Sequence, residues 1–113
     1  MPDNQEINVH ILRQLARQPY TTQREFAKQL SVSLGRINFC MNALLDKGWI
    51  KAQNFQRSDK RLAYLYLLTP EGLEHKARLT ARFLQRKRAE YDALRAEIDQ
   101  LSAELEAEGL IDT

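Results

Sequence analysis

The spacing of apolar residues predicts three helices in the first half of the chain. Apolar side chains recur at helical intervals in residues 7–15, 26–30 and 34–47. The first helix ends at about Arg17 because Pro19 follows it, and Gly48 stands where a left-handed residue would close the third helix. Residues that can cap a helix N-terminus precede the three segments: Asp3, Thr22 and Ser33.

Beyond Gly48 the pattern changes to that of a β-hairpin and one long helix. Residues 49–55 and 62–68 predict two strands separated by a polar turn. Thr69 and Pro70 form a helix start, and residues 73–108 contain neither Gly nor Pro. We therefore expect one helix of roughly 40 residues, about 55–60 Å long, which a small domain cannot cover along its whole length.

The third predicted helix has an apolar face and an opposite face suited to contacts with DNA bases. At 100° per residue, the apolar side chains lie about 200–300° from Asn38, and the opposite face spans about 0–100°. Asparagine can pair bidentately with adenine, and a phenylalanine ring can pack on a thymine methyl group. Arg36, to one side, could reach a phosphate, and Gly35 would let the backbone approach closely. The predicted DNA-binding residues of this helix are Ser33, Gly35, Arg36, Asn38, Phe39 and Asn42.

An ordinary amphipathic helix with a polar outer face is the alternative interpretation. Phe39 favours contact with DNA, because an exposed aromatic ring on a polar face is typical of a binding surface. Asp46 lies on the same face and favours the alternative, because phosphates would repel its carboxylate.

The turn of the predicted hairpin is basic. Arg57, Lys60 and Arg61 could lie on the DNA backbone or enter the minor groove, although a solvated turn would have the same composition. Because the hairpin follows a helix predicted to contact DNA, contact of these basic residues with DNA is favoured over a solvated turn. The element order then predicts a mainly α-helical protein with a small β-hairpin: a winged helix-turn-helix domain in residues 1–69, followed by a long C-terminal coiled-coil helix in residues 70–113.

Several segments of the chain resemble the MarR family of winged-helix transcriptional regulators. The resemblance covers about residues 7–75 and rests on four segments: residues 25–30, 32–33, 44–50 and 68–72. Larger MarR proteins have an additional N-terminal dimerisation helix, whereas this sequence begins at the first helix of the motif. This departure argues against the pocket for a phenolic effector that the larger proteins have, and the sequence identifies no small-molecule effector.

A narrower resemblance concerns residues 33–40 and 77–84, which read Ser-Leu-Gly-Arg-Ile-Asn-Phe-Cys and Ala-Arg-Leu-Thr-Ala-Arg-Phe-Leu. Both segments look like those of the small MarR-type regulators associated with bacterial exopolysaccharide gene clusters. This resemblance implies a gene neighbourhood and carries no information about the chemistry of the chain.

The long predicted helix carries a stripe typical of a coiled coil. From Leu73 to Leu105, ten positions alternate four and three residues apart, which is more than four heptads. Packing on the helix's own domain could explain the first part of the stripe, to about Phe83, but not the far end. The sequence therefore predicts a homodimer held by Leu84, Tyr91, Leu94, Ile98, Leu101 and Leu105.

Two orientations of the paired helices are open. A parallel pair would place Lys87 against its own copy, while allowing an ion pair between Glu90 and Arg95. An antiparallel pair would lay the basic residues 76–88 against the acidic residues 97–112 of the other chain. Because one exposed ion pair contributes at most about 1 kcal/mol, the charge blocks favour the antiparallel arrangement.

Composition and charge narrow the class of protein. Residues 1–69 have ten Lys and Arg against five Asp and Glu, a balance of +5, which suits a polyanionic partner. No apolar run approaches the roughly 20 residues that span a bilayer, and the N-terminus does not have the layout of a signal peptide. These features predict a cytoplasmic protein, and the resemblance to MarR regulators implies a bacterial, nucleoid-associated one.

No catalytic residue, metal site or cofactor is predicted. Cys40 is the only cysteine, and it falls on the apolar face of the third helix, which suggests a buried thiol. His10 and His75 have no acidic or cysteine companion at ligand spacing. No phosphate-binding loop or nucleophile motif is present, so an enzyme is not expected.

Together these features predict a sequence-specific transcriptional regulator that binds double-stranded DNA as a homodimer and has no membrane partner. A winged-helix protein-interaction module on a coiled-coil scaffold is the alternative. The basic residues Arg36, Arg57, Lys60 and Arg61 favour DNA, whereas an acidic hairpin would have favoured a protein partner.

Overall fold

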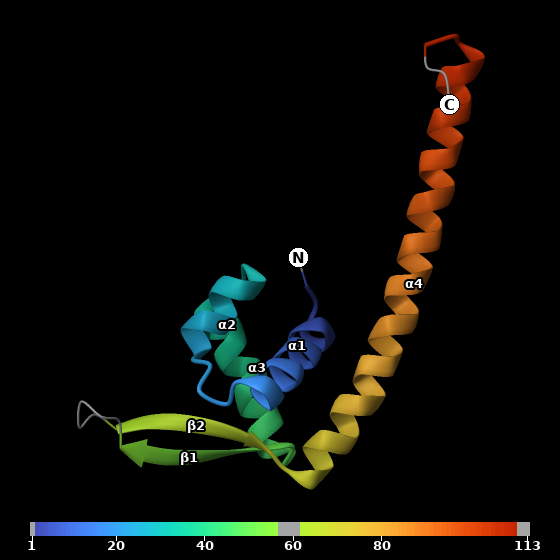
Figure 1. The fold of residues 1–113 in the computed structure, drawn as a ribbon. Helices are drawn as coiled ribbons and strands as arrows, with labels where there is room; N and C mark the ends of the chain where they lie inside the picture. Colours follow the sequence, from blue (N-terminus) through green and yellow to red (C-terminus); the bar gives the residue numbers. More distant parts are fainter. Residues whose placement is uncertain (1, 57–61, 111–113) are drawn as a thin grey trace. The chain divides into compact units, whose positions relative to one another are not determined.

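The computed structural model describes residues 2–56 and 62–110 (Figure 1). The chain forms the elements α1 (Asn4–Arg17), α2 (Gln23–Leu30), α3 (Leu34–Asp46), β1 (Ile50–Gln56), β2 (Leu62–Leu68) and α4 (Pro70–Ala107). Each element expected from the sequence is present, and the mainly helical architecture with one hairpin is confirmed.

A side-chain oxygen caps each of the three short helices. Asp3 Oδ1 accepts a hydrogen bond from the backbone N–H of Glu6, at 2.8 Å, and Ser33 Oγ accepts one from the N–H of Arg36, at 3.1 Å. Thr22 caps α2 in the same way. Each cap satisfies a backbone donor that the helix leaves unpaired, and typically contributes about 1 kcal/mol.

Helix α3 ends in a turn that explains a small difference from the expected boundaries. Gly48 has φ +74°, and the N–H of Trp49 donates to the carbonyl oxygen of Leu44 at 3.1 Å. This left-handed closing turn uses Trp49, which the sequence pattern assigns to the start of the strand. The strand therefore begins at Ile50, and the helix ends at Asp46 with Lys47 as its C-cap.

Ser31 forms an equivalent turn after α2, at φ +55°. The N–H of Val32 donates to the carbonyl oxygen of Ala27, at 3.1 Å. Glycine is the usual residue at such a position, so the sequence pattern indicates a short connector here but not its left-handed residue.

The core lies between α1, α2, α3 and the first residue of β1. Its members are almost fully buried apolar residues: Ile7, Ile11, Leu12, Leu15, Phe26, Ile37, Cys40, Met41, Leu44 and Ile50. All three helices contribute to this single cluster, and their packing fixes which face of α3 is left outside.

The hairpin pairs β1 and β2 in an antiparallel register that runs from Ile50 opposite Leu68 to Gln56 opposite Leu62. The N–H of Tyr66 also donates to the carbonyl oxygen of Pro19, at 3.1 Å, which connects β2 to the segment between α1 and α2. This bond attaches the hairpin to the helical core.

The start of α4 belongs to the same compact unit. The chain divides into residues 1–80 and residues 81–113, and Leu79 packs against the core of the first unit. Gly72 lies so close to Trp49 that a Cβ atom there would overlap the Trp49 carbonyl oxygen and lie 2.8 Å from its carbonyl carbon. Only glycine permits this approach of α4 to the chain before β1.

None of the helices in the described residues combines the length and the apolar character that crossing a bilayer requires.

Candidate DNA interface

The exposed face of α3 carries the side chains predicted to contact DNA bases. Gly35, Asn38 and Asn42 are placed on this side of the helix, and Phe39 has 64% of its surface accessible to solvent. The predicted core face of the helix is buried in the cluster described above. The expected division of the two faces is therefore confirmed, whereas the contacts with bases stay a prediction.

Three amide side chains form a chain of hydrogen bonds on this face. Asn42 Nδ2 donates to Asn38 Oδ1 at 3.1 Å, and Asn38 Nδ2 donates to Gln23 Oε1 at 3.3 Å. The chain connects the first residue of α2 to two successive turns of α3. These bonds favour the rotamers that form them, so the two asparagines share one arrangement on this exposed face.

Gln23 was not among the residues predicted from the sequence. It is the first residue of α2 and directly follows the cap residue Thr22. Its contact with Asn38 joins residues fifteen positions apart in two helices, so no periodicity within one helix could indicate it. The only local signal is an amide at the start of the helix that precedes α3.

Arg36 is tied to the protein more closely than expected. Its Nε donates to Oδ1 of Asn4 at 3.3 Å, which connects α3 to the start of α1. One of the five guanidinium donors is used there, and the terminal amino groups can still reach a phosphate. Ser33 likewise has a structural task, because its hydroxyl accepts the capping hydrogen bond of α3.

Cys40 lies on the inner side of the same helix, as expected, and is 2% exposed. Burial raises the pKa of its thiol, and the positive charge of Arg36 offsets only part of that effect. The neutral thiol is therefore the favoured form, which suits a small buried apolar residue.

The predicted basic residues of the hairpin tip, Arg57, Lys60 and Arg61, lie outside the described residues. The described strands of the hairpin carry exposed polar side chains on β1, among them Lys51 and Asn54. An exposed Tyr64 on β2 stacks with Tyr66, with ring centroids 6.3 Å apart.

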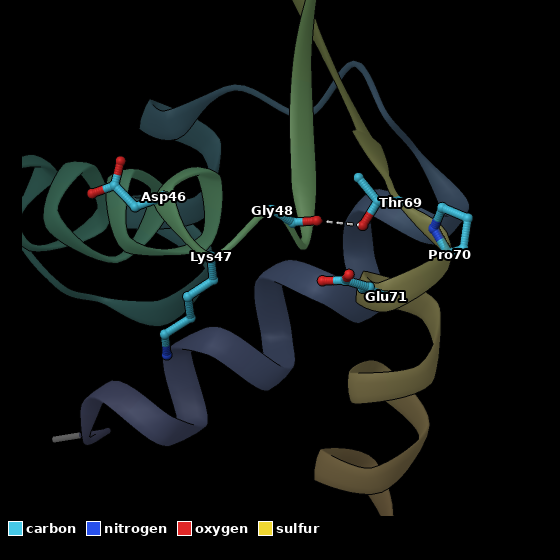
Figure 2. Close-up of a pocket in the computed structure, with 6 residues that line it drawn as sticks. All are labelled: Asp46, Lys47, Gly48, Thr69, Pro70 and Glu71. Carbon is cyan, nitrogen blue, oxygen red and sulfur yellow. Dashed lines mark hydrogen bonds between the residues drawn. The ribbon is translucent and has the colours of Figure 1, made fainter.

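A pocket of about 490 Å³ lies where α3 ends and α4 begins (Figure 2). Asp46, Lys47, Gly48, Thr69, Pro70 and Glu71 line it. The Thr69 hydroxyl donates to the carbonyl oxygen of Gly48 at 2.5 Å and accepts from the N–H of Gly72. Two carboxylates and one ammonium group belong to this lining, so the pocket is unsuited to a phosphate, and the Thr69 bonds give it a structural role.

The two histidines are engaged in packing. His75 stacks on Trp49 with ring centroids 4.0 Å apart, and the Lys47 ammonium lies 4.7 Å from the centroid of the same indole. His10 contacts Gln29 at 2.7 Å and meets Phe26 edge to face. Within the described residues, no three His, Cys, Asp or Glu side chains are grouped as a metal ion would require.

The residues predicted to hold a dimer together form an exposed apolar stripe on α4. Their accessible fractions run from 39% to 62%: Leu84, Tyr91, Leu94, Ile98, Leu101 and Leu105. Single exposed leucines are common on protein surfaces, whereas six exposed apolar residues at coiled-coil spacing in one helix are typical of an interaction surface.

Comparison with known proteins identifies the fold. A family model described as winged helix-turn-helix DNA-binding matches residues 5–51, which contain most of α1, all of α2 and α3, and the first two residues of β1. The chain has a winged helix-turn-helix fold. In the terms of this fold, α3 is the recognition helix and the β1–β2 hairpin is the wing. A search of the curated proteins gives no match.

Several solved structures share this fold. The adhesin competence repressor AdcR of Streptococcus pyogenes is 20% identical, with a TM-score of 0.62 over 92% of this chain and 78% of its own. A MarR transcriptional regulator of Methanosarcina mazei is 19% identical, with a TM-score of 0.61 over 93% and 77%. The zinc-responsive MarR family member ZitR of Lactococcus lactis is 24% identical, with a TM-score of 0.59 over 89% and 71%. The resemblance to the MarR family is confirmed at the level of the fold.

Proposed function

We propose that the protein is a sequence-specific transcriptional regulator that binds double-stranded DNA as a homodimer. The observation that carries the proposal is the outer face of α3, where the exposed ring of Phe39 accompanies Asn38 and Asn42 on a helix whose opposite face is buried. The match of residues 5–51 to a DNA-binding family model supports the same function.

Asn38 and Asn42 are the residues that read adenine in this proposal, with Phe39 against a thymine methyl group. Arg36 contacts a phosphate with its remaining donors, and Gly35 lets the backbone of α3 approach the groove. The wing residues Arg57, Lys60 and Arg61 bind the DNA backbone or the minor groove.

The domain organisation follows from these roles. Residues 1–69 bind DNA, and residues 70–113 supply the helix that joins two copies through the exposed stripe on α4. The protein works on chromosomal DNA in the bacterial cytoplasm. Its narrower resemblance to small regulators of exopolysaccharide gene clusters supports genes of that kind as targets.

The function can be tested by fluorescence anisotropy with labelled DNA fragments from around the protein's own gene, at several salt concentrations. Binding should be specific for one fragment and should weaken steeply with salt, because Lys and Arg release counterions from DNA. Scrambled DNA of the same composition is the control. Equal affinity for both DNAs would reject sequence-specific binding, and no binding to either would favour a protein-interaction module.

A further inference from the structure

The orientation of the proposed dimer can be inferred from the side chains that border the exposed stripe of α4, and the inference rests on the homodimer proposed above. The stripe alternates between the two inner positions of a heptad. Leu84, Tyr91, Ile98 and Leu105 occupy position a, and Lys87, Leu94 and Leu101 occupy position d. Positions e and g then border the stripe, one on each side.

The two borders carry opposite charges. Position g holds Phe83, Glu90, Glu97 and Glu104, and position e holds Ala81, Arg88, Arg95 and Ser102. From residue 88 onwards, the g border is therefore entirely acidic, and the e border is basic or neutral. These positions are the ones whose side chains touch across a two-stranded coiled coil and set its orientation.

The two possible orientations bring different borders together. In a parallel pair, a g residue faces the e residue five positions later in the other chain, so Glu90 of each chain meets Arg95 of the other. In an antiparallel pair, g faces g and e faces e. Glu90 would then lie near Glu97 of the other chain, and Arg88 near Arg95, if Tyr91 packs opposite Leu94.

We propose that α4 binds the α4 of a second copy of this chain in parallel, through the stripe from Leu84 to Leu105, with Glu90 of each helix paired to Arg95 of the other. The acidic and basic borders make the helix complementary to a parallel copy of itself and repulsive to an antiparallel one.

Lys87 is the residue that most opposes a parallel seam, because it would face its own copy at position d. The structure removes much of this conflict. The Lys87 ammonium lies 3.1 Å from Oε2 of Glu90 and 5.1 Å from the ring centroid of Phe83. Both partners are g residues, about 40–60° to the same side of Lys87 around the helix. The charge therefore sits over the acidic border, and the methylene stem can fill the seam.

The opposite argument comes from blocks of like charge, which favour an antiparallel pair. Three of the six basic residues in residues 70–88 occupy outer positions: Arg78, Arg82 and Arg86. Charges on outer faces are separated from the other helix by about a Debye length or more, which is about 8–10 Å at physiological salt, and are largely screened. The charges at e and g are in direct contact, so their signs decide the orientation.

The test is the dimer dissociation constant of the full-length protein, measured by sedimentation equilibrium. Arg95→Glu places a carboxylate opposite Glu90 at two symmetric sites of a parallel dimer, so we expect dissociation to become roughly tenfold more favourable. The charge swap of Glu90→Arg with Arg95→Glu restores the pair across the seam but removes Glu90 from Lys87, so we expect it to recover part of the loss caused by Arg95→Glu. Arg82→Glu makes the same charge change on the outer face and is the matched control, with little expected effect.

An antiparallel dimer would respond in the opposite direction. There, Arg95→Glu would face Arg88, and the charge swap would also relieve Glu90 from Glu97, so both variants would dimerise more tightly than the wild type. That outcome would overturn the parallel orientation and leave the proposed dimer intact. A wild-type protein that remains monomeric at every concentration would instead overturn both.

Disulfide cross-linking in a Cys40→Ala background gives a second measurement that does not depend on charge. In a parallel dimer, the cysteine introduced by Leu101→Cys lies beside its own copy and should oxidise to a linked dimer, because a disulfide needs Cα atoms within about 7 Å. In the antiparallel register above, the two introduced sulfurs would be about 25 Å apart along the axis. Leu101→Cys would then cross-link only when mixed with Leu84→Cys, which would reject the proposal.

Discussion

The Nδ2 of Asn42 donates a hydrogen bond to Oδ1 of Asn38, one turn earlier in α3, at 3.1 Å. Asn38 in turn donates to Gln23 at 3.3 Å. The position of the Asn42 amide therefore depends on Asn38 and Gln23. The two asparagines are therefore not equivalent in this series of hydrogen bonds. Asn42 lies at the end of the chain of amides, and Asn38 holds it in place.

A difference between the two alanine variants follows from this arrangement. Asn42→Ala should relax the preference at one base pair, by roughly 1–3 kcal/mol of discrimination. Asn38→Ala removes its own base contact and the support of Asn42, so it should relax two positions. Selection of binding sites from random DNA, with each variant and the wild type, would measure this.

Gln85→Ala is the control, because it removes a helical amide from α4, which does not belong to the proposed DNA-reading face. Identical selected motifs from the wild type and Asn42→Ala would show that Asn42 does not read a base. The reading face would then have to be assigned around Arg36.

Gln23 gives a separate prediction, because it supports Asn38 without belonging to α3. Gln23→Ala removes one exposed side-chain hydrogen bond, which contributes about 0.5–1.5 kcal/mol. We expect a partial loss of the same base preference that Asn38→Ala abolishes, with unchanged salt-dependent binding to random DNA. Competition binding against random DNA separates the base preference from the nonspecific affinity. A loss of equal size on both DNAs would show that Gln23 binds the backbone instead.

Cys40 makes the stability of the domain depend on pH above the ordinary pKa of a thiol. The folded state keeps the thiol neutral because burial raises its pKa, whereas the unfolded chain ionises at the ordinary value. The folded state therefore binds more protons than the unfolded state as the pH rises past that value, and the free energy of unfolding falls. Below the ordinary thiol pKa, the thiol is protonated in both states, and the burial of Cys40 contributes fully to the free energy of unfolding.

The measurement is the difference between the wild type and Cys40→Ala in chemical denaturation at about pH 7 and about pH 10, on either side of the ordinary thiol pKa. All other side chains are common to the two proteins, so their contributions largely cancel. The wild type should lose more stability between these pH values than the variant does. Parallel losses would contradict the raised pKa of the thiol.

The boundaries of most elements follow from single residues, and for that reason the sequence predicts them well. Thr69 and Pro70 mark the start of α4, and Thr69 accepts the expected capping bond from Gly72. The same hydroxyl also donates to Gly48, a contact that exists only once the end of α3 and the start of α4 are packed together. Local signals predict the cap, and tertiary structure adds its second partner.

The candidate interface divides in the same way. The exposed face of α3 could be predicted because burial follows the helical period. The amide chain and the bond from Arg36 to Asn4 could not, because each joins residues distant in the sequence whose separation depends on how the helices pack. The orientation of α4 is an intermediate case. It depends on whether each charged residue occupies position e or position g, and the total charge of a segment does not show this.

Gly72 should tolerate no side chain, although it lies in a helix. Its missing Cβ is the space occupied by the carbonyl group of Trp49, a backbone group that cannot rotate away. Gly72→Ala should therefore lower the free energy of unfolding by about 1–3 kcal/mol or more, despite the better helix propensity of alanine. Thermal denaturation followed by circular dichroism measures the effect. A variant as stable as the wild type would show that α4 does not approach Trp49 so closely.

Gly35 provides the opposite case and the sharpest test of the recognition helix. It lies in the first turn of α3, and a Cβ atom there would have no neighbour within 4 Å. Gly35→Ala should raise the free energy of unfolding by roughly 0.5–1 kcal/mol, because alanine forms helices better than glycine. In the proposed complex, the same methyl group would lie where the backbone of α3 approaches the groove. DNA affinity should therefore fall, by about tenfold, which corresponds to about 1.4 kcal/mol. A variant that is more stable and binds less tightly cannot be explained by unfolding, so the loss would report direct contact. If Gly35→Ala gains stability and binds operator DNA as the wild type does, the DNA does not approach this turn of α3.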